Sequence, residues 1–290
     1  MSGQSSKSGS FDSPLFNMSL HKGIDVLMSF GPGRPDMNLA EIADAAGLSK
    51  SAAQRFAYTL ETLGFLRKDA RTKRFSLTPK TVELGYRYLL VNPLIERANP
   101  YLLDLNKRCG ETVNLAEPDG TDMVYVARFA TSQHASVHMP VGRRLPMFCT
   151  SSGRALLSAL PPEQAYEILK SSPRPKFTPA TITDLDVLMG LLEQAREQGY
   201  SYAGGEYYRG DLNISLPILD AHGAPMAAIN ISAPSVRWTP ARLKRELVPE
   251  LIETGRLIST TPPSPRDVEP FRQGYGTSAR LLNTKLPGDR

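Results

Sequence analysis

The feature that most constrains this chain is the segment 38–77, in which two short capped helices are followed by a hairpin pattern. Asn38 with Glu41 three residues later has the pattern of a capping box, and Ser49 can cap a second helix. Gly47 lies between them and allows a tight turn, because glycine adopts left-handed backbone angles without strain. This pattern predicts a helix-turn-helix.

A helix before this segment and a hairpin after it complete a winged arrangement. Apolar residues recur at three- and four-residue steps over 19–28, as on one face of a helix. Two short alternating stretches, 65–67 and 74–77, flank a polar and basic turn at 68–73. Three helices and a two-stranded wing predict a winged helix-turn-helix domain over 18–79.

The helix that follows Ser49 has one face suited to DNA. Its predicted buried stripe consists of Ala53, Phe56, Ala57, Leu60 and Leu63. The opposite face carries no acid, and both Gln54 and Arg55 can form paired hydrogen bonds with a base edge. The basic wing turn suits phosphates or a minor groove. We therefore predict DNA contacts by Lys50, Ser51, Gln54, Arg55, Tyr58, Lys68, Arg71, Lys73 and Arg74.

The distribution of charge also favours contact with a polyanion. The whole chain has a formal net charge of +5. Residues 19–80 hold ten lysines and arginines against six acids, whereas the long central stretch 81–262 is nearly neutral. A basic excess concentrated in one small domain is typical of DNA-binding proteins.

The remainder of the chain mixes helices and strands, which predicts an α+β fold. Thr78-Pro79 begins a helix that runs to Asn92, and its apolar residues surround the axis instead of forming one stripe. Hairpin signals occur at 117–120 and 220–223. Further helices are expected over 94–108, 153–160, 163–170, 183–198 and 240–258, and strands over 111–116, 123–128, 136–139, 212–219 and 226–232.

Composition narrows the class of protein. Apolar residues make up 41% of the chain, yet no apolar run approaches the roughly 18 residues that a membrane span requires. The Ser/Gly-rich start lacks the apolar segment of a secretory signal, and Cys109 and Cys149 form no disulfide or metal motif. We therefore expect a cytoplasmic protein, with disordered tails over 1–17 and 262–290.

A series of short motifs, in fixed order from residue 19 to about 260, is shared with a known family. The motifs are Ser19–Leu27, Ala40–Ala43, Gly47–Ser51, Leu60–Leu66, Gly110–Val113, Val124–Val126, Val141–Pro146, Ser152–Leu157, Thr181–Asp184, Glu197–Tyr200, Pro217–Asp220 and Ala227–Ser232. In this order and spacing they resemble the IclR family of bacterial transcription regulators, and in particular its branch linked to aromatic-acid catabolism.

The resemblance implies a GAF/PAS-like α/β effector-binding domain, here 94–261, which a linker helix over 80–93 joins to the DNA-binding domain. It also implies dimers or tetramers and small carboxylate effectors. We accordingly expect a non-enzymatic, sequence-specific regulator that binds a near-palindromic operator in double-stranded DNA. No cofactor or metal is expected, and the protein would be nucleoid-associated when bound to DNA.

The residues themselves also suggest where a carboxylate could bind. Ser151 and Ser152 precede a helix expected from Gly153, and a helix start offers free N–H groups and a positive dipole end. Carried over by position, the family's effector pocket falls on His134, Val137, Ser151, Ser152, Ala203, Asp211, Asn213, Asn230 and Ser232. An apolar position of the family is here Asp211, a departure that leaves the ligand's identity open.

Two alternative functions follow from the same residues. Cys149 with upstream His134 and His138 can be drawn as a nucleophile with a base, or as part of a zinc site. Either arrangement would make the chain a GAF-like enzyme or metal sensor fused to a DNA-binding module. The second alternative is a constitutive DNA-binding protein whose C-terminal domain only oligomerises.

Overall fold

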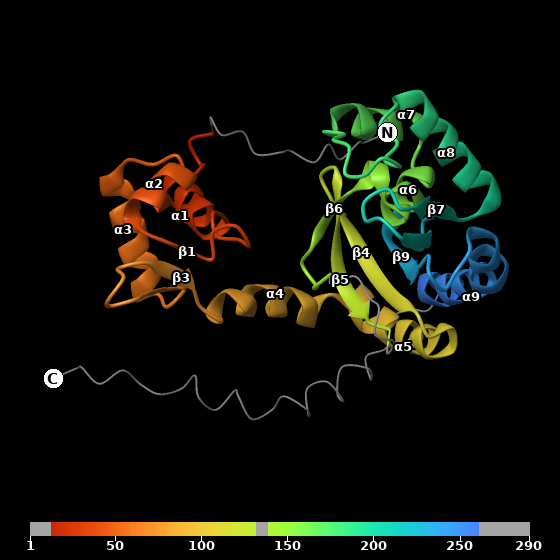
Figure 1. The fold of residues 1–290 in the computed structure, drawn as a ribbon, viewed down its shortest axis with the longest axis horizontal. Coiled ribbons are helices and arrows are strands. Elements are labelled where there is room, and N and C mark those ends of the chain that lie inside the picture. The colour runs from red at the N-terminus through yellow and green to blue at the C-terminus, as the bar shows by residue number, and fades with distance from the viewer. Residues whose placement is uncertain (1–12, 132–138, 261–290) are drawn as a thin grey trace. The chain divides into compact units, whose positions relative to one another are not determined.

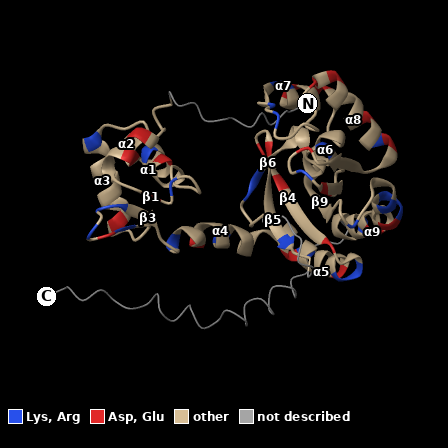
Figure 2. Cartoon of the chain, viewed as in Figure 1, with Lys and Arg blue, Asp and Glu red and all other residues tan. Residues whose placement is uncertain are grey.

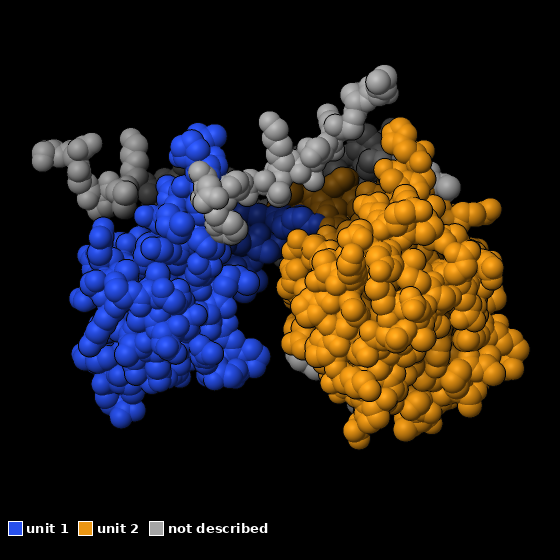
Figure 3. Space-filling view, turned by 90° about the horizontal axis from the view of Figure 1, so that it is seen from above, with its two compact units in different colours: residues 1–88 blue, residues 89–290 orange. Residues whose placement is uncertain are grey.

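The computed structural model describes residues 13–131 and 139–260, so residues 136–138 of the expected strand over 136–139 and most of both tails lie outside the described residues. The chain divides into two compact units, residues 1–88 and 89–290 (Figure 3). Among the described residues, no helix is both long enough and apolar enough to cross a membrane.

The first unit contains the helices α1 to α3, a small sheet and the larger part of α4, Lys80–Val91 (Figure 1). The helices are α1 Met18–Met28, α2 Leu39–Ala45 and α3 Lys50–Thr62. The strands β2 Leu66–Lys68 and β3 Phe75–Leu77 form the predicted wing. A further strand, β1 Asp36–Met37, pairs with the other side of β3 and was missed because two residues carry no periodicity.

The two helix caps predicted in the first unit, Asn38 and Ser49, are confirmed. The Asn38 side chain accepts hydrogen bonds from the amides of Ala40 and Glu41, and the Glu41 carboxylate accepts one from the Asn38 amide at 2.7 Å. Ser49 accepts from the Ala52 amide at the start of α3. The core of the unit consists of Val26, Phe30, Met37, Ile42, Ala43, Ala53, Ala57, Leu60, Leu66 and Phe75.

One predicted core position of α3 is wrong. Leu63 is 51% exposed because it lies beyond the last helical residue, at the C-cap, where the chain has already turned away from the packed face. Phe56 is half-buried at the edge of the same core.

The helix α4, Lys80–Val91, has no fully buried side chain. Large apolar side chains are exposed on all its sides, namely Val82, Leu84, Tyr86, Tyr88, Leu90 and Val91. This matches the predicted absence of a single apolar stripe.

The second unit is built on a six-stranded sheet with the order β6-β5-β4-β9-β8-β7, in which every neighbouring pair is antiparallel. Its strands are β4 Thr112–Asp119, β5 Asp122–Phe129, β6 Arg144–Pro146, β7 Ser201–Gly204, β8 Asp211–Leu219 and β9 Pro225–Pro234. The short edge strands β6 and β7 were not predicted from the sequence.

Helices cover both faces of this sheet (Figure 1). On one face, α5 Pro93–Cys109 and α9 Pro240–Thr260 pack on an aliphatic core that includes Leu115, Ile214 and Ile229. On the other face lie α6 Ser151–Ser158, α7 Pro162–Ser171 and α8 Leu185–Gln198, preceded by the short 3-10 helix η1 Met147–Cys149. The expected α+β fold is confirmed.

Three predicted boundaries of this unit are corrected. The first hairpin turns at Gly120-Thr121, because β4 continues through Pro118 to Asp119, which pairs with Asp122. Asp184 caps α8 instead of Thr183, since its carboxylate accepts from the Val187 amide. Thr150 caps α6, which therefore begins at Ser151.

Candidate functional site

The third helix presents the polar face that the sequence predicted. Lys50, Ser51, Gln54, Arg55 and Tyr58 are all exposed, whereas Ala53, Ala57 and Leu60 are buried on the opposite side. Tyr58 is 70% exposed, although tyrosine is usually partly buried. An exposed, acid-free helix face of this composition can approach a polyanion without charge repulsion.

The wing turn is held in shape by an acid. The Asp69 carboxylate accepts hydrogen bonds from the Arg71 and Thr72 amides, at 3.0 and 2.6 Å. The hydrogen bond from Thr72 is the main reason that the pKa of Asp69 lies below its ordinary value. Lys73 takes a left-handed backbone angle there, with φ of 60°. The turn and the end of β2 therefore present Lys68, Arg71 and Lys73 as exposed cations. Figure 2 shows lysine and arginine positions in the part of the chain beside β3.

Arg74 differs from the other predicted DNA contacts. Its guanidinium forms ion pairs with Asp36 on β1 and with Glu41 on α2, the latter at 2.8 Å. The pKa of Glu41 is lowered first by the hydrogen bond from the Asn38 amide and further by Arg74. Arg74 thus connects the wing to α2, and two carboxylates already offset its charge.

In the second unit, a pocket lies where the start of α6 meets β5, β7 and β8. Its lining consists of Tyr125, Met139, Leu145, Cys149, Thr150, Ser151, Ala203, Gly205, Glu206, Tyr207, Tyr208, Asp211 and Asn213. The cavity volume is about 20 Å³, little more than one water molecule needs.

The buried start of α6 has unmatched donors. Ser151 and Ser152 are 2% and 1% exposed, and no described residue accepts a hydrogen bond from either amide. The Ser152 hydroxyl, also buried, has no hydrogen-bond partner among the described residues, although it lies near enough to the Tyr125 phenol to lower the pKa of that group. A buried helix start without partners is unusual and favours an anion there.

Neighbouring strands fix the position of this helix start. The Ser201 hydroxyl of β7 donates to the Ser151 carbonyl at 2.9 Å, and the Thr150 hydroxyl accepts from the Gly153 amide at 3.2 Å. A Cβ atom at Gly153 would lie 2.2 Å from the Cα atom of Met147, so only glycine lets η1 pack this closely on α6.

Polar side chains from four strands form a chain of hydrogen bonds on the same sheet face. Arg128 donates to Asn114, Asn114 to Asn230, and Asn230 to Asn213, at 3.1, 3.1 and 3.0 Å. Asn213 and Ser232 then donate to the two oxygens of the Asp211 carboxylate, at 2.8 and 2.7 Å. Antiparallel pairing places Asn114 opposite Asn230 and Asn213 opposite Ser232, which explains the continuity of the chain.

Burial shifts the ionisation of the groups along this chain. Desolvation raises the pKa of Asp211, and the hydrogen bonds from Asn213 and Ser232 only partly offset it. Desolvation also raises the pKa of Tyr125 and lowers the pKa of Arg128. The pocket is therefore a poorly solvated site in which a charged group depends strongly on its partners.

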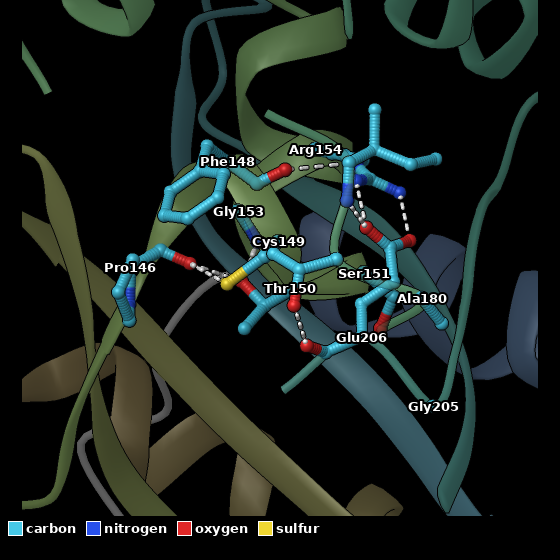
Figure 4. A network of polar contacts seen from close by, with 12 residues as sticks. Pro146, Phe148, Cys149, Thr150, Ser151, Gly153, Arg154, Ala180, Gly205 and Glu206 are labelled. Atoms are coloured by element: carbon cyan, nitrogen blue, oxygen red, sulfur yellow. Dashed lines mark hydrogen bonds and ion pairs between the residues drawn. The ribbon is translucent and has the colours of Figure 1, made fainter. Parts of the chain in front are cut away.

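A buried ion pair closes one wall of the pocket (Figure 4). Arg154 of α6 donates through Nη1 and Nη2 to the two carboxylate oxygens of Glu206, both at 2.6 Å, and through Nε to the Phe148 carbonyl. Glu206 also accepts from the Ile182 amide at 3.2 Å. The pair fixes α6 against the loop that follows β7.

The structure brings together seven of the nine predicted pocket residues. Ser151, Ala203, Asp211 and Asn213 line the cavity. Ser152 follows Ser151 on α6, and Asn230 and Ser232 are hydrogen-bonded to the lining residues Asn213 and Asp211. His134 and Val137 lie outside the described residues.

Sequence reasoning missed the aromatic and acidic part of the lining. Glu206, Tyr207 and Tyr208 follow an unpredicted edge strand, and Tyr125 was noted only as part of a motif. The run Gly204-Gly205-Glu206-Tyr207-Tyr208 was the available signal, since two adjacent glycines indicate a loop and binding residues are often found on loops.

The structure gives little support to the alternative hypothesis that Cys149 is a catalytic nucleophile or a zinc ligand. The thiol is 1% exposed, and burial raises its pKa to about 12, so it would be a poor nucleophile. Over 13–131 and 139–260, no cluster of three or more His, Cys, Asp or Glu side chains could hold a metal ion. His134 and His138 lie outside that part of the chain.

Comparison with known protein families gives two matches. The family described as "Bacterial transcriptional regulator IclR C-terminal" matches residues 86–260, and the "IclR helix-turn-helix domain" matches residues 19–70. Together they account for most of the described chain in the order that the sequence motifs indicated.

Individual proteins extend this likeness along the chain. The Pca regulon regulatory protein of Pseudomonas putida is 35% identical over 244 residues, covering 84% of this chain and 83% of the relative. The crystal structure of the Thermotoga maritima IclR has a TM-score of 0.66 and 30% identity, over 83% of this chain and 97% of that one. An IclR homologue from Microbacterium hydrocarbonoxydans, complexed with 4-hydroxybenzoate, has a TM-score of 0.69 and 27% identity, over 83% and 98%.

Proposed function

The chain belongs to the IclR family of bacterial transcriptional regulators, and from this premise we propose that a small organic acid, aromatic in character, controls its binding to a near-palindromic operator. The single observation that supports an acidic ligand is the buried start of α6, whose amides at Ser151 and Ser152 have no acceptor among the described residues. A carboxylate would satisfy both donors and the helix dipole together.

For the DNA half, α3 would enter the major groove, with Gln54 and Arg55 reading bases. Lys50, Ser51 and Tyr58 and the wing cations Lys68, Arg71 and Lys73 would contact phosphates. Arg74 would add less, since Asp36 and Glu41 already hold its guanidinium.

Two copies would be needed to read a near-palindromic site, because one recognition helix covers only a few base pairs. The exposed apolar side chains of α4 supply a surface for a second copy. Sedimentation should show a dimer, or a tetramer through the second units, at micromolar concentration. A monomer on and off DNA would contradict this part of the proposal.

For the sensing half, the acid's body would contact Ala203, Asn213, Asn230 and Ser232, together with His134 and Val137 from outside the described residues. The cavity is much smaller than an aromatic acid, so binding requires the Tyr207-Tyr208 loop to move. Such a movement can alter DNA binding only if the acid favours one arrangement of the DNA-binding units over others.

Neither a reaction nor a cofactor is part of the proposal, since relatives such as the HTH-type transcriptional regulator KdgR of Escherichia coli are named as regulators and Cys149 is buried with a raised pKa. A bacterial regulator acts where the chromosome lies, so we expect the protein in the cytoplasm and on the nucleoid when bound to DNA.

The DNA assignment is tested with two alanine variants on the operator and on random DNA. Arg55→Ala should cost about 1–3 kcal/mol at the operator and relax one base position. Arg71→Ala should weaken binding to all DNA similarly and reduce the salt dependence. Equal effects of both variants on both DNAs would contradict the assignment.

The acid assignment is tested by calorimetry with aromatic and short aliphatic acids on the full chain. Ser151→Trp should fill the pocket and abolish acid binding, whereas Ser171→Trp, on the exposed end of α7, should leave it unchanged. Equal acid affinity in wild type and Ser151→Trp would place the ligand elsewhere. A variant that lost acid binding while its DNA affinity still responded to the acid would disprove the coupling.

A further inference from the structure

Asp211 is a buried, pocket-lining carboxylate without a cation partner. It is 6% exposed, and it forms no ion pair with any residue that the structure describes. Arg128 influences its pKa only as the smallest contribution, and the Arg128 guanidinium donates to Asn114 instead. A buried carboxylate is costly unless donors satisfy it, which points to a further donor that would reach it from the pocket.

The donors already at Asp211 leave room for one more. Asn213 and Ser232 each occupy one lone pair, on different oxygens, and an ionised carboxylate offers about four acceptor positions. Both donors favour the ionised form, which accepts hydrogen bonds and cannot donate them. A ligand group that meets this carboxylate therefore has to be a donor.

Asp211 on β8 and Ser151 at the start of α6 line the same pocket from different elements. The Ser201 hydroxyl donates to the Ser151 carbonyl and Ser201 pairs with Ser215, while Asp211 lies four residues before Ser215, at the first position of β8. Four residues of an antiparallel strand span roughly 14 Å. Ser151 and Asp211 line the same cavity of about 20 Å³, so a substituted benzoate can lie between them only when that cavity opens.

We propose that Asp211 is a specificity-determining residue: it selects acids that carry a hydrogen-bond donor, a hydroxyl or an amine, at the end remote from the carboxylate, and it excludes dicarboxylates. This inference rests on the proposed function, because it assumes that the acid's carboxylate binds at Ser151 and Ser152. A second carboxylate at the far end would face Asp211 at close range, and like charges in a poorly solvated site repel strongly.

The experiment measures dissociation constants by calorimetry on the full chain at neutral pH. The probes are benzoate, its meta and para hydroxy, amino and methoxy derivatives, and terephthalate. We expect at least one hydroxy or amino acid to bind about tenfold or more tightly than benzoate, because only it satisfies Asp211. The methoxy derivative, which accepts but cannot donate, and terephthalate should bind no better than benzoate.

Two variants of Asp211 and one control variant distinguish the effect of this carboxylate on ligand affinity from general effects of removing a carboxylate. Asp211→Leu should remove the hydroxy or amino advantage while benzoate still binds, since the amides of α6 remain. Asp211→Asn, which keeps the shape and removes the charge, should improve terephthalate binding by about tenfold or more. Asp186→Asn, on the exposed first turn of α8, should change none of these ratios.

Each outcome bears on a different claim. If no acid of the panel binds, the proposed acid site fails and the inference fails with it. If benzoates bind but hydroxy, amino and methoxy forms do so equally, or if the preference persists in Asp211→Leu, the acid site stands and the role of Asp211 is disproved. Tight terephthalate binding to the wild-type chain would also overturn the inference.

Discussion

The two faces of the six-stranded sheet differ in composition, because the same strands present aliphatic side chains to one face and polar side chains to the other. The face under α5 and α9 is aliphatic, with Leu115, Ile214, Ile229 and Ile231 all fully buried. The face under α6 carries the buried hydrogen-bonded chain from Arg128 to Asp211. Alternation along each strand makes this division possible, because neighbouring side chains point to opposite faces. The aliphatic face stabilises the fold, whereas burying polar side chains on the other face lowers its stability and forms the candidate site.

The largest expected effect is on the ion pair that closes the polar face. Glu206→Ala should lower the free energy of unfolding by about 3–5 kcal/mol, because it leaves Arg154 charged, buried and unpaired. Denaturant unfolding measures this loss. The double variant Arg154→Met with Glu206→Leu should recover most of it, and a double variant as unstable as Glu206→Ala would contradict the explanation.

On the aliphatic face, Ile214→Ala should cost about 2–5 kcal/mol, because it removes a fully buried side chain and leaves a cavity. The affinity for the effector should stay nearly constant, since Ile214 points away from the pocket. Unfolding and calorimetry on one preparation check both statements. A loss of ligand affinity as large as the loss of stability would show that the two faces are not separable.

A smaller effect is expected in the middle of the polar chain. Asn230→Ala should cost roughly 1–3 kcal/mol, because Asn114 and Asn213 each lose a hydrogen-bond partner in a buried setting. Unlike Ile214→Ala, it should also weaken acid binding, which calorimetry would show. Replacing Ser215, whose hydroxyl donates to the Ile229 carbonyl on the same face, by alanine is the matched control outside the chain.

The smallest effect concerns pH. The pKa of Asp211 is raised in the folded protein above its ordinary value of 3.8, so between these two values the folded state binds more protons than the unfolded state. Stability therefore falls as the pH rises through that window. Asp211→Asn should remove this decline and gain stability relative to wild type towards neutral pH. Parallel stability curves for the two proteins against pH would rule out Asp211 as the source of the decline.

The features that could be predicted from the sequence are those that depend on residues close together in the chain. Periodicity found the long strands and helices, and the caps at Asn38 and Ser49 were correct because capping depends on neighbouring residues alone. The exposed face of α3 was likewise readable from one helix. The edge strands β6 and β7 were missed, because three or four residues gain their structure only from pairing with a distant strand.

The pocket required contacts between distant parts of the chain. The residues of its polar strands were named from the family resemblance, but their hydrogen-bonded order depends on the register of β4, β8 and β9. Glu206 could not be assigned, because its partner Arg154 lies 52 residues away on another element. Sequence alone gives no distance between such residues.

The helix α4 has a mechanical consequence. An isolated helix of 12 residues without a buried side chain is marginally stable in water, since its backbone hydrogen bonds barely offset the ordering of the chain. The helix that connects the two units would then be flexible in a single copy and rigid once a second copy packs against it. A conformational change at the ligand pocket would reach the DNA-binding unit only when the helix is ordered. The concentration of the chain, which sets how much of it is paired, would therefore set how strongly ligand binding affects DNA binding.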